Sequence, residues 1–379
     1  MRFLRTTSTA RLLAFVIGVA CLAGATAAIA LAATSQGGSK PPSKPLAVAV
    51  HDALSAPQVP GVSARIKFTN HLIDSAAIPG APALLTGAGG RLWASADGRV
   101  RLELQSDSGD AQLVLDHGRF LLYDASSNTA YRGDLGQQPQ HKDMGGAAPS
   151  LAQIKQALGH ASHYAGISGA IPTTAAGRSA YEVRITPRQG GRVSGLRLAW
   201  DAIRGVPLRI AVYARGDGSP VLSLSAQSVS YGSVPASVFA ISPPKGAHVV
   251  DVTPPGSGGG GSHVSGLRSV RRALPFHLSA PSKLAGKARQ DVRLIGHDGA
   301  LLSYGQGLDG IVVLEQKADA QGQQLGGGLR LPTVQVGGVS GQELPTALGT
   351  VVRFTRNGVQ YTVLGSQTTA TILAAARAL

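Results

Sequence analysis

The stretch between Gly90 and Gly136 constrains the fold most, because its short apolar runs recur about every ten residues and each is followed by a turn signal. These signals are Asp97-Gly98, Ser108-Gly109, His117-Gly118 and the polar run 124–128. Within the first repeat, Val100, Leu102 and Leu104 alternate with Arg99, Arg101 and Glu103. This pattern predicts an antiparallel meander with one apolar face and one charged face.

The same alternation recurs on both sides of the meander. It predicts one sheet that includes strands at 62–68, 91–94, 100–104, 183–185, 196–200 and 208–212. Apolar residues at helical spacing predict helices at 45–55, where proline stands first, and at 150–158. The Gly- and Pro-rich stretch 70–90 is interpreted as a wide loop or lid. Glu182, Arg184, Arg197 and Arg209 are expected near one another on the outer face of the sheet.

The N-terminal residues 1–33 indicate export. Three arginines precede an uncharged apolar run from Leu12 to Ala33, and a Pro-rich tether follows at 34–45. As a helix this run would be roughly 33 Å long, which is enough to cross a bilayer. We therefore expect an extracytoplasmic protein held in the cell membrane by this segment. The alternative is cleavage near the small residues Ala30-Leu31-Ala32 and release of a secreted protein.

The only cysteine, Cys21, lies inside the apolar run. Gly18-Val19-Ala20-Cys21 loosely resembles a bacterial lipoprotein box, but apolar residues follow Cys21 where a mature lipoprotein would become polar. The exported part therefore has neither a disulfide nor a thiolate metal site.

The formal charge of +15 divides into +5, +4 and +6 for residues 1–45, 46–253 and 263–379. Most basic residues are single arginines on alternating strand positions, which is typical of a solvated sheet face. No segment concentrates the charge as a nucleic-acid-binding patch would, so we expect no nucleic-acid partner. Attraction to an anionic membrane surface remains compatible with this charge.

Several motifs along residues 46–253 together point to one family. A helix and an amphipathic strand precede GRLWASADGRVRLEL and LLYDASSNTAYRG, and the domain closes with Val234-Pro235, Phe239 and Pro243-Pro244-Lys245-Gly246. In these motifs the region resembles the LolA/RseB superfamily of bacterial envelope proteins. The resemblance implies an α+β, mainly β fold: a curved antiparallel half-barrel whose concave apolar face is closed by helices.

Relatives of the LolA type hold acyl chains of lipids or lipoproteins in this cavity. By resemblance, the expected lining is Ile66, Phe68, Leu92, Leu102, Leu104, Val183, Ile185, Leu196, Leu198, Trp200 and Ile210. The main hypothesis is thus a membrane-anchored binder of lipid or lipoprotein acyl chains. The alternative is an RseB-like envelope-stress regulator, which binds a membrane anti-sigma factor.

A second domain is predicted after the Gly/Ser linker 254–262. Residues 263–379 are interpreted as a small α+β domain with an Asn357-Gly358 hairpin and a closing helix at 366–379. This tail resembles an uncharacterised bacterial envelope domain through Gly358, Tyr361 and Gly365, followed by Ile372, Ala375 and Leu379.

Enzymatic signatures are weak throughout the chain. Residues 305–310 formally match G-x-G-x-x-G, but a strand is predicted after them, where a dinucleotide site requires a helix. His160 and His163 are three residues apart without a third ligand nearby, so they are interpreted as surface histidines. We expect no catalytic residues, no metal site, no cofactor and no enzymatic activity.

Overall fold

A computed structural model describes residues 38–73, 85, 87–107, 109–134, 149–188, 191–240, 242–252, 264–318 and 331–379. These residues form two compact units. One contains 38–188 and 194–252, and the other contains 264–379 with 191–193. The expected membrane segment 12–33 and linker 254–262 lie outside the described residues. No helix among those residues is sufficiently long and apolar to cross a membrane.

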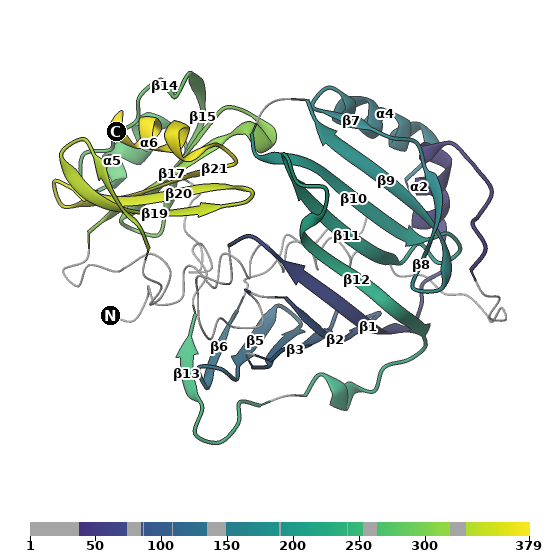
Figure 1. Cartoon of the computed structure of the whole chain (residues 1–379). Helices are drawn as coiled ribbons and strands as arrows, with labels where there is room; N and C mark the ends of the chain where they lie inside the picture. The colour runs from purple at the N-terminus through teal and green to yellow at the C-terminus, as the bar shows by residue number, and fades with distance from the viewer. Residues whose placement is uncertain are drawn as a thin grey trace. The chain divides into compact units, whose positions relative to one another are not determined.

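The first unit is built on a single 13-stranded sheet, ordered β13-β6-β5-β4-β3-β2-β1-β12-β11-β10-β9-β7 with β8 beside β9. The sheet curves strongly, so that β1–β6 and β8–β12 form two walls (Figure 1). This is the mainly β, curved half-barrel that the sequence predicts. The strands are β1 (Gly61–Asn70), β2 (Ala88–Ser95), β3 (Val100–Gln105), β4 (Ala111–Asp116), β5 (Arg119–Asp124), β6 (Thr129–Asp134), β7 (Ala165–Ile167), β8 (Ile171–Ala175), β9 (Arg178–Pro187), β10 (Val193–Asp201), β11 (Pro207–Ala214), β12 (Pro220–Tyr231) and β13 (His248–Asp251).

The meander is confirmed, since β2 to β6 pair in sequence order as antiparallel neighbours. The wide loop predicted between Asn70 and Gly90 is wrong at its C-terminal end, because Ala88 opens β2. Gly90 explains this difference. A Cβ built there would lie 1.9 Å from the carbonyl oxygen of Glu103, so only glycine allows β2 and β3 to approach this closely.

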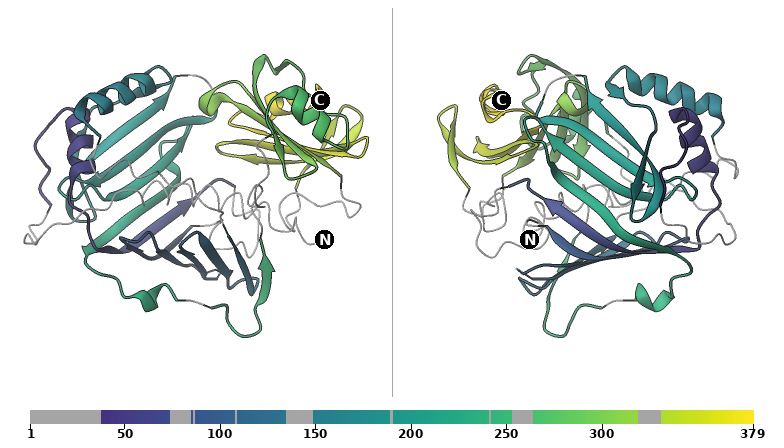
Figure 2. Two further views of the ribbon diagram at one scale, coloured as in Figure 1. Left: turned by 180° about the vertical axis from the view of Figure 1, so that it is seen from behind. Right: turned by 45° about the vertical axis from the view of Figure 1, so that its right-hand side comes forward.

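Two helices cover one end of this sheet. They are α2 (Leu46–Ser55) and α4 (Leu151–Ser162), which contact each other beside β7 and β9 (Figure 2). Ser150 begins α4 with a capping box, in which Gln153 N donates to Ser150 Oγ at 3.3 Å and Ser150 N donates to Gln153 Oε1 at 2.8 Å. Both helices confirm the predictions at 45–55 and 150–158, with α4 four residues longer at its C-terminus.

The second unit is an antiparallel eight-stranded sheet ordered β14-β15-β16-β17-β21-β20-β19-β18. The Asn357-Gly358 hairpin is confirmed between β20 and β21, and both turn residues have positive φ, 51° and 73°. The strand β17 follows residues 305–310, as predicted from the sequence. The elements of the second unit are α5 (Leu267–Ala273), β14 (Lys283–Leu284), β15 (Lys287–Ile295), β16 (Gly299–Tyr304), η3 (Gly307–Asp309), β17 (Ile311–Lys317), β18 (Thr333–Val336), β19 (Val339–Thr346), β20 (Gly349–Arg356), β21 (Val359–Gly365) and α6 (Thr369–Arg377).

Candidate functional site

The strand register places the predicted lining residues of β1, β2 and β3 on one face of the sheet. Gly90 lies opposite both Ile66 and Leu104, and Leu92 lies opposite Leu102. Directly paired residues share a face, and so do residues two apart in a strand. Phe68, two residues after Ile66, therefore belongs to the same face.

The second wall continues this face. Phe68 is paired with Leu224 of β12, and Leu224 is paired with Ile210 of β11. In β9 and β10, Leu196 pairs with Ile185 and Leu198 pairs with Val183. Arg209 forms an ion pair with Glu182 at 2.7 Å, so their neighbours Ile210 and Val183 both point to the opposite side. We call the surface formed by the predicted lining residues the apolar face.

Burial divides the apolar face into packed and accessible parts. Val183 and Trp200 are buried in a cluster with Tyr181 and with Ala49 of α2, so at this end the face is a packed core beneath a helix. Ile66, Phe68, Leu102 and Leu104 are also buried. The partly exposed members are Leu92, Ile185, Leu196, Leu198 and Ile210. Ile185 and Leu198 pack against the cluster beneath α2, so Leu92, Leu196 and Ile210 are the part of the face that a ligand could contact.

Sequence reasoning missed members of the same face in the meander. Leu113 pairs with Leu102, and Leu115 pairs with Val100; in β5 their partners are Leu122 and Phe120. All four are buried. Leu113, Val114 and Leu115 form an unbroken apolar run, so the alternation that marks a face is absent there. The register alone identifies the side on which each one lies.

The outer face carries the charges. Glu182 is 5% exposed and accepts from Arg184 at 3.0 Å and from Arg209 at 2.7 Å, which confirms the expected cluster. Arg197 instead lies over the Tyr213 ring, 4.5 Å from its centroid. Because Glu182 is satisfied by two arginines, the cluster stabilises the sheet and offers no reactive carboxylate.

The closing motif also packs on the outer side. Phe239, at the end of the short helix η2 (Ala236–Val238), is buried, and the Arg99 guanidinium lies 4.9 Å from its ring centroid. Arg101 Nη1 donates to the Val238 carbonyl at 2.8 Å. The chain then adds β13 to the sheet edge as a parallel partner of β6, a pairing that sequence periodicity did not predict.

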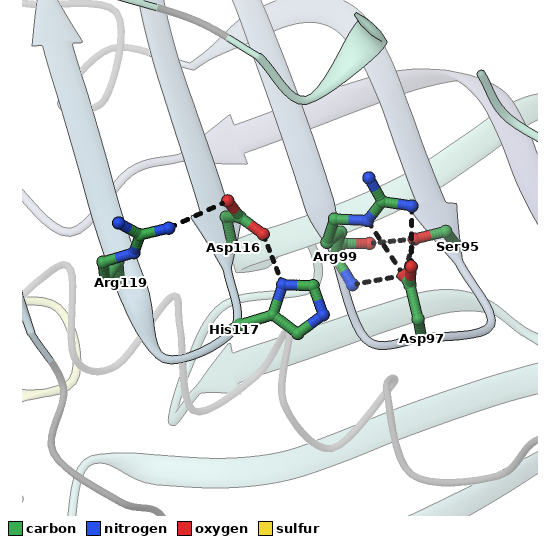
Figure 3. Close-up of polar contacts among 6 residues, drawn as sticks. All are labelled: Ser95, Asp97, Arg99, Asp116, His117 and Arg119. Atoms are coloured by element: carbon green, nitrogen blue, oxygen red, sulfur yellow. Dashed lines mark hydrogen bonds and ion pairs between the residues drawn. The ribbon is translucent and has the colours of Figure 1, made fainter. Parts of the chain in front are cut away.

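The turns of β2–β3 and β4–β5 carry neighbouring polar clusters (Figure 3). Asp97 accepts from Ser95 Oγ and forms an ion pair with Arg99 at 2.6 Å. Hydrogen bonds from Arg99 and Ser95 hold the pKa of the Asp97 carboxyl well below its usual range. A carboxylate that stays ionised in this way is a poor general acid or base near neutral pH.

At the second turn, Asp116 forms an ion pair with Arg119 at 3.5 Å and lies 2.6 Å from Nδ1 of His117 (Figure 3). His117 adopts a positive φ of 47° at the turn, and its side chain is 62% exposed. The Nδ1 contact of His117 is to Asp116 and the hydroxyl of Ser95 contacts Asp97, so the two residues do not form a nucleophile–base pair. Both clusters shape the turns.

The described part of the chain contains no group of three or more His, Cys, Asp or Glu side chains that could hold a metal ion. His160 and His163 are exposed, with ring centroids 6.5 Å apart.

Comparisons with known proteins give distant structural similarities. No family model and no curated protein matches the chain. A Pseudomonas aeruginosa MucA/MucB complex matches at 18% identity, over 87% of this chain and 94% of that chain, with a TM-score of 0.41. MucB alone matches at 17% identity, over 87% and 96%, with a TM-score of 0.41. A conserved protein from Thermus thermophilus matches at 12% identity, over 54% and 96%, with a TM-score of 0.34.

The solved structures similar to this chain thus include MucB, alone and in complex with MucA. At these identities and TM-scores, the similarity assigns neither a ligand nor a partner to this chain.

Proposed function

We propose that this protein is an extracytoplasmic binder of lipid or lipoprotein acyl chains, anchored in the cell membrane by residues 12–33. One observation carries the proposal. The register of the curved sheet gathers aliphatic side chains on one face, and Leu92, Ile185, Leu196, Leu198 and Ile210 remain partly exposed there. A protein that kept this face only as a core would gain by burying them completely.

The chemistry of this face suits a flexible hydrocarbon chain. Its accessible members are branched aliphatic residues, whereas a site for planar ligands usually includes aromatic rings. Burying each methylene stabilises a complex by about 0.8 kcal/mol, so an acyl chain of about a dozen carbons could offset the entropy lost on binding. The export signal supports an extracytoplasmic location, where such lipids and lipoproteins are found.

A regulator that binds a membrane anti-sigma factor is the second candidate. It is favoured by the two-unit organisation, because the RseB type that the sequence resembles joins the lipid-binding domain to a smaller C-terminal one. In that function the outer surfaces of the two units would bind a protein, and the apolar face would serve as a core or as a lipid sensor.

Binding of a fluorescent fatty-acyl probe tests the proposal. Leu196→Asp puts a carboxylate on an accessible position of the apolar face, where ionisation is costly without a partner. We expect the affinity for the probe to fall at least about tenfold, which corresponds to about 1.4 kcal/mol. The matched control is Ser228→Asp, which adds the same charge on an exposed position of β12 opposite Arg65, on the outer face.

Circular dichroism and thermal unfolding of both variants distinguish lost binding from lost folding. Failure of the probe to bind the unaltered protein, or equal weakening by both substitutions, would rule out acyl binding at this face. Native mass spectrometry of the protein purified from its own membrane would then show whether a protein partner is bound instead.

A further inference from the structure

The turn between β10 and β11 exposes a large apolar side chain. Ile203 is 70% exposed, more than the other exposed large apolar residues of the described chain, Tyr164 at 61% and Val249 at 37%. Tips of such turns usually carry Gly, Asn, Asp or Ser, which satisfy the turn backbone. An isoleucine at this position buries little within the unit, so its apolar surface is available to something outside it.

A buried carboxylate holds this turn in one conformation. Asp201 is 3% exposed, and its Oδ1 accepts from the backbone N–H groups of Ile203 and Arg204, both at 2.9 Å. Its Oδ2 accepts from the Tyr231 hydroxyl at 2.8 Å. Gly205 then takes a positive φ of 68° and packs so closely on α2 that a Cβ would lie 2.2 Å from the Ala53 carbonyl oxygen. Ile203 is therefore presented by a rigid loop, which lowers the entropy cost of docking.

The chain enters the first unit beside the same turn. Ser179 Oγ donates to the Ser39 carbonyl, and the Ser179 carbonyl accepts from Ala202 N at 2.9 Å. Gly38 packs directly on the β8–β9 turn, where a Cβ would lie 2.9 Å from the Gly177 carbonyl oxygen. Two hydrogen bonds through Ser179 thus connect the first described residues to the residue that precedes Ile203.

The length of the preceding chain limits how far this edge can be from a membrane. The apolar run ends at Ala33. Five residues of fully extended chain from Ala33 to Gly38 can span at most about 18 Å. The polar headgroup layer itself occupies roughly 5 to 8 Å beyond the hydrocarbon core. If residues 12–33 cross the bilayer, the edge that carries Gly38 and Ile203 must lie at or just above the lipid headgroups.

The charges of this edge fit an anionic lipid surface. Lys40 is exposed, and the guanidinium groups of Arg178 and Arg204 lie 5.0 and 5.8 Å from the centroid of the Tyr231 ring. Asp201, the acidic residue of the turn, is buried and hydrogen-bonded. Basic and aromatic side chains around a projecting aliphatic residue are the combination that favours the interface between headgroups and acyl chains.

We propose that this edge, formed by Lys40, Arg178, Ile203, Arg204 and Tyr231, is a membrane-docking surface that places Ile203 among the headgroups of an anionic bilayer. The inference rests on the proposed anchoring by residues 12–33. Docking fixes the orientation of the first unit, because the turn that carries Ile203 directly follows the end of β10. Leu196, an accessible residue of the apolar face, then lies on a strand that leads away from the lipid surface.

An environment-sensitive fluorophore at position 203 tests the docking. The full chain carrying Cys21→Ala and Ile203→Cys is labelled with NBD and reconstituted into vesicles of phosphatidylcholine with phosphatidylglycerol. We expect blue-shifted emission and a loss of fluorescence when headgroup-labelled nitroxide lipid is added. Omitting phosphatidylglycerol should weaken both effects, since the cations then lose their counter-charge.

Tyr164→Cys in the same background is the matched control. Tyr164 is also an exposed apolar residue, and its carbonyl accepts from Arg188 N at 3.0 Å, just beyond the other end of β9. The ten residues of β9 place it roughly 30 Å from the Arg178 end. The NBD label at position 164 should show the emission expected in water and should not be quenched by the nitroxide lipid.

Alkaline carbonate extraction separates failure of the anchor from failure of the docking surface. Suppose that the chain resists extraction. If the NBD label at 203 then shows the emission expected in water, or if the labels at 203 and 164 are quenched equally, the docking surface is overturned and the anchor is left intact. A chain released by carbonate overturns the anchor. The released protein is then added to the same vesicles, where quenching at 203 alone supports the surface and its absence overturns it.

Discussion

Replacing Glu315 by Gln is expected to abolish most of the loss of stability that the second unit undergoes between pH 5 and pH 9. Glu315 is 0% exposed, and burial raises the pKa of its carboxyl to about 8, although the Ser279 N–H and the charge of Arg271 oppose this rise. Ser279 N donates to Oε2 at 2.9 Å, while the buried Oε1 has no hydrogen-bond partner among the described residues. The folded unit therefore holds the protonated acid near neutral pH.

The direction of the pH effect follows from the two pKa values. Below the usual value of 4.5 the group is protonated in both states and stability does not depend on it. Between 4.5 and about 8 the unfolded chain releases the proton and the folded chain keeps it, so the free energy of unfolding decreases as pH rises. Above a pH of about 8 the loss is complete, at most on the order of 5 kcal/mol.

Glu315→Gln keeps the shape and an acceptor for Ser279 N without a titrating group, so its stability should vary little across this range. Differential scanning calorimetry from pH 5 to pH 9 measures the effect. As pH rises, the midpoint temperature of one unfolding transition should fall in the unaltered chain and not in the Glu315→Gln variant. Asp298→Asn, which removes an exposed carboxylate of the same unit, should leave the shift in place. A transition whose pH dependence is the same with and without Glu315 would contradict the prediction.

Gly90→Ala is expected to destabilise the first unit by about 3 kcal/mol, because the new methyl group would overlap backbone that cannot move away. Its Cβ would lie 1.9 Å from the carbonyl oxygen of Glu103 and 3.2 Å from the Cα of Leu104. Relief requires β2 and β3 to separate where Gly90 lies opposite Leu104 on the apolar face. The substitution should therefore weaken acyl-probe binding as well as folding.

Gly89→Ala provides the matched control. It is the preceding residue of the same strand, and a Cβ built there meets nothing within 4 Å. The substitution should be neutral or slightly stabilising, since alanine restricts the unfolded chain more than glycine does. Urea unfolding followed by the fluorescence of Trp93 and Trp200, the two tryptophans of the chain, compares both variants. Equal midpoints for the two alanine variants would show that the sheet adjusts freely at Gly90.

Local sequence patterns were sufficient to predict the elements whose formation depends on neighbouring residues. Alternation at Val100, Leu102 and Leu104 predicted a strand with one apolar face, because side chains in a strand alternate between its two sides. The helix predicted from Ser150 onward begins at Leu151, directly after Ser150, whose side chain caps α4. The strand predicted after residues 305–310 is confirmed as β17.

Sequence patterns failed to predict elements that depend on a strand or helix distant in the sequence. The stretch at 70–90 contains glycines that suggest a loop, but Gly90 pairs with both neighbouring strands. The helix α5 was missed because it is short and rich in arginine, so its few apolar residues show no clear helical period. The parallel pairing of β13 with β6 joins residues that lie far apart in the sequence, such as His248 and Thr129.

The sequence by itself determined the mainly β class, the meander and the apolar and charged sides of the alternating strands, because each depends on neighbouring residues and on the two-residue period of a strand. Only the tertiary structure decided which apolar residues are accessible. It buried Val183 and Trp200 beneath α2, left Leu196 and Ile210 partly exposed, and enclosed Glu315 completely. Accessibility depends on which distant elements cover a side chain, and the period of a single strand carries no information about that cover.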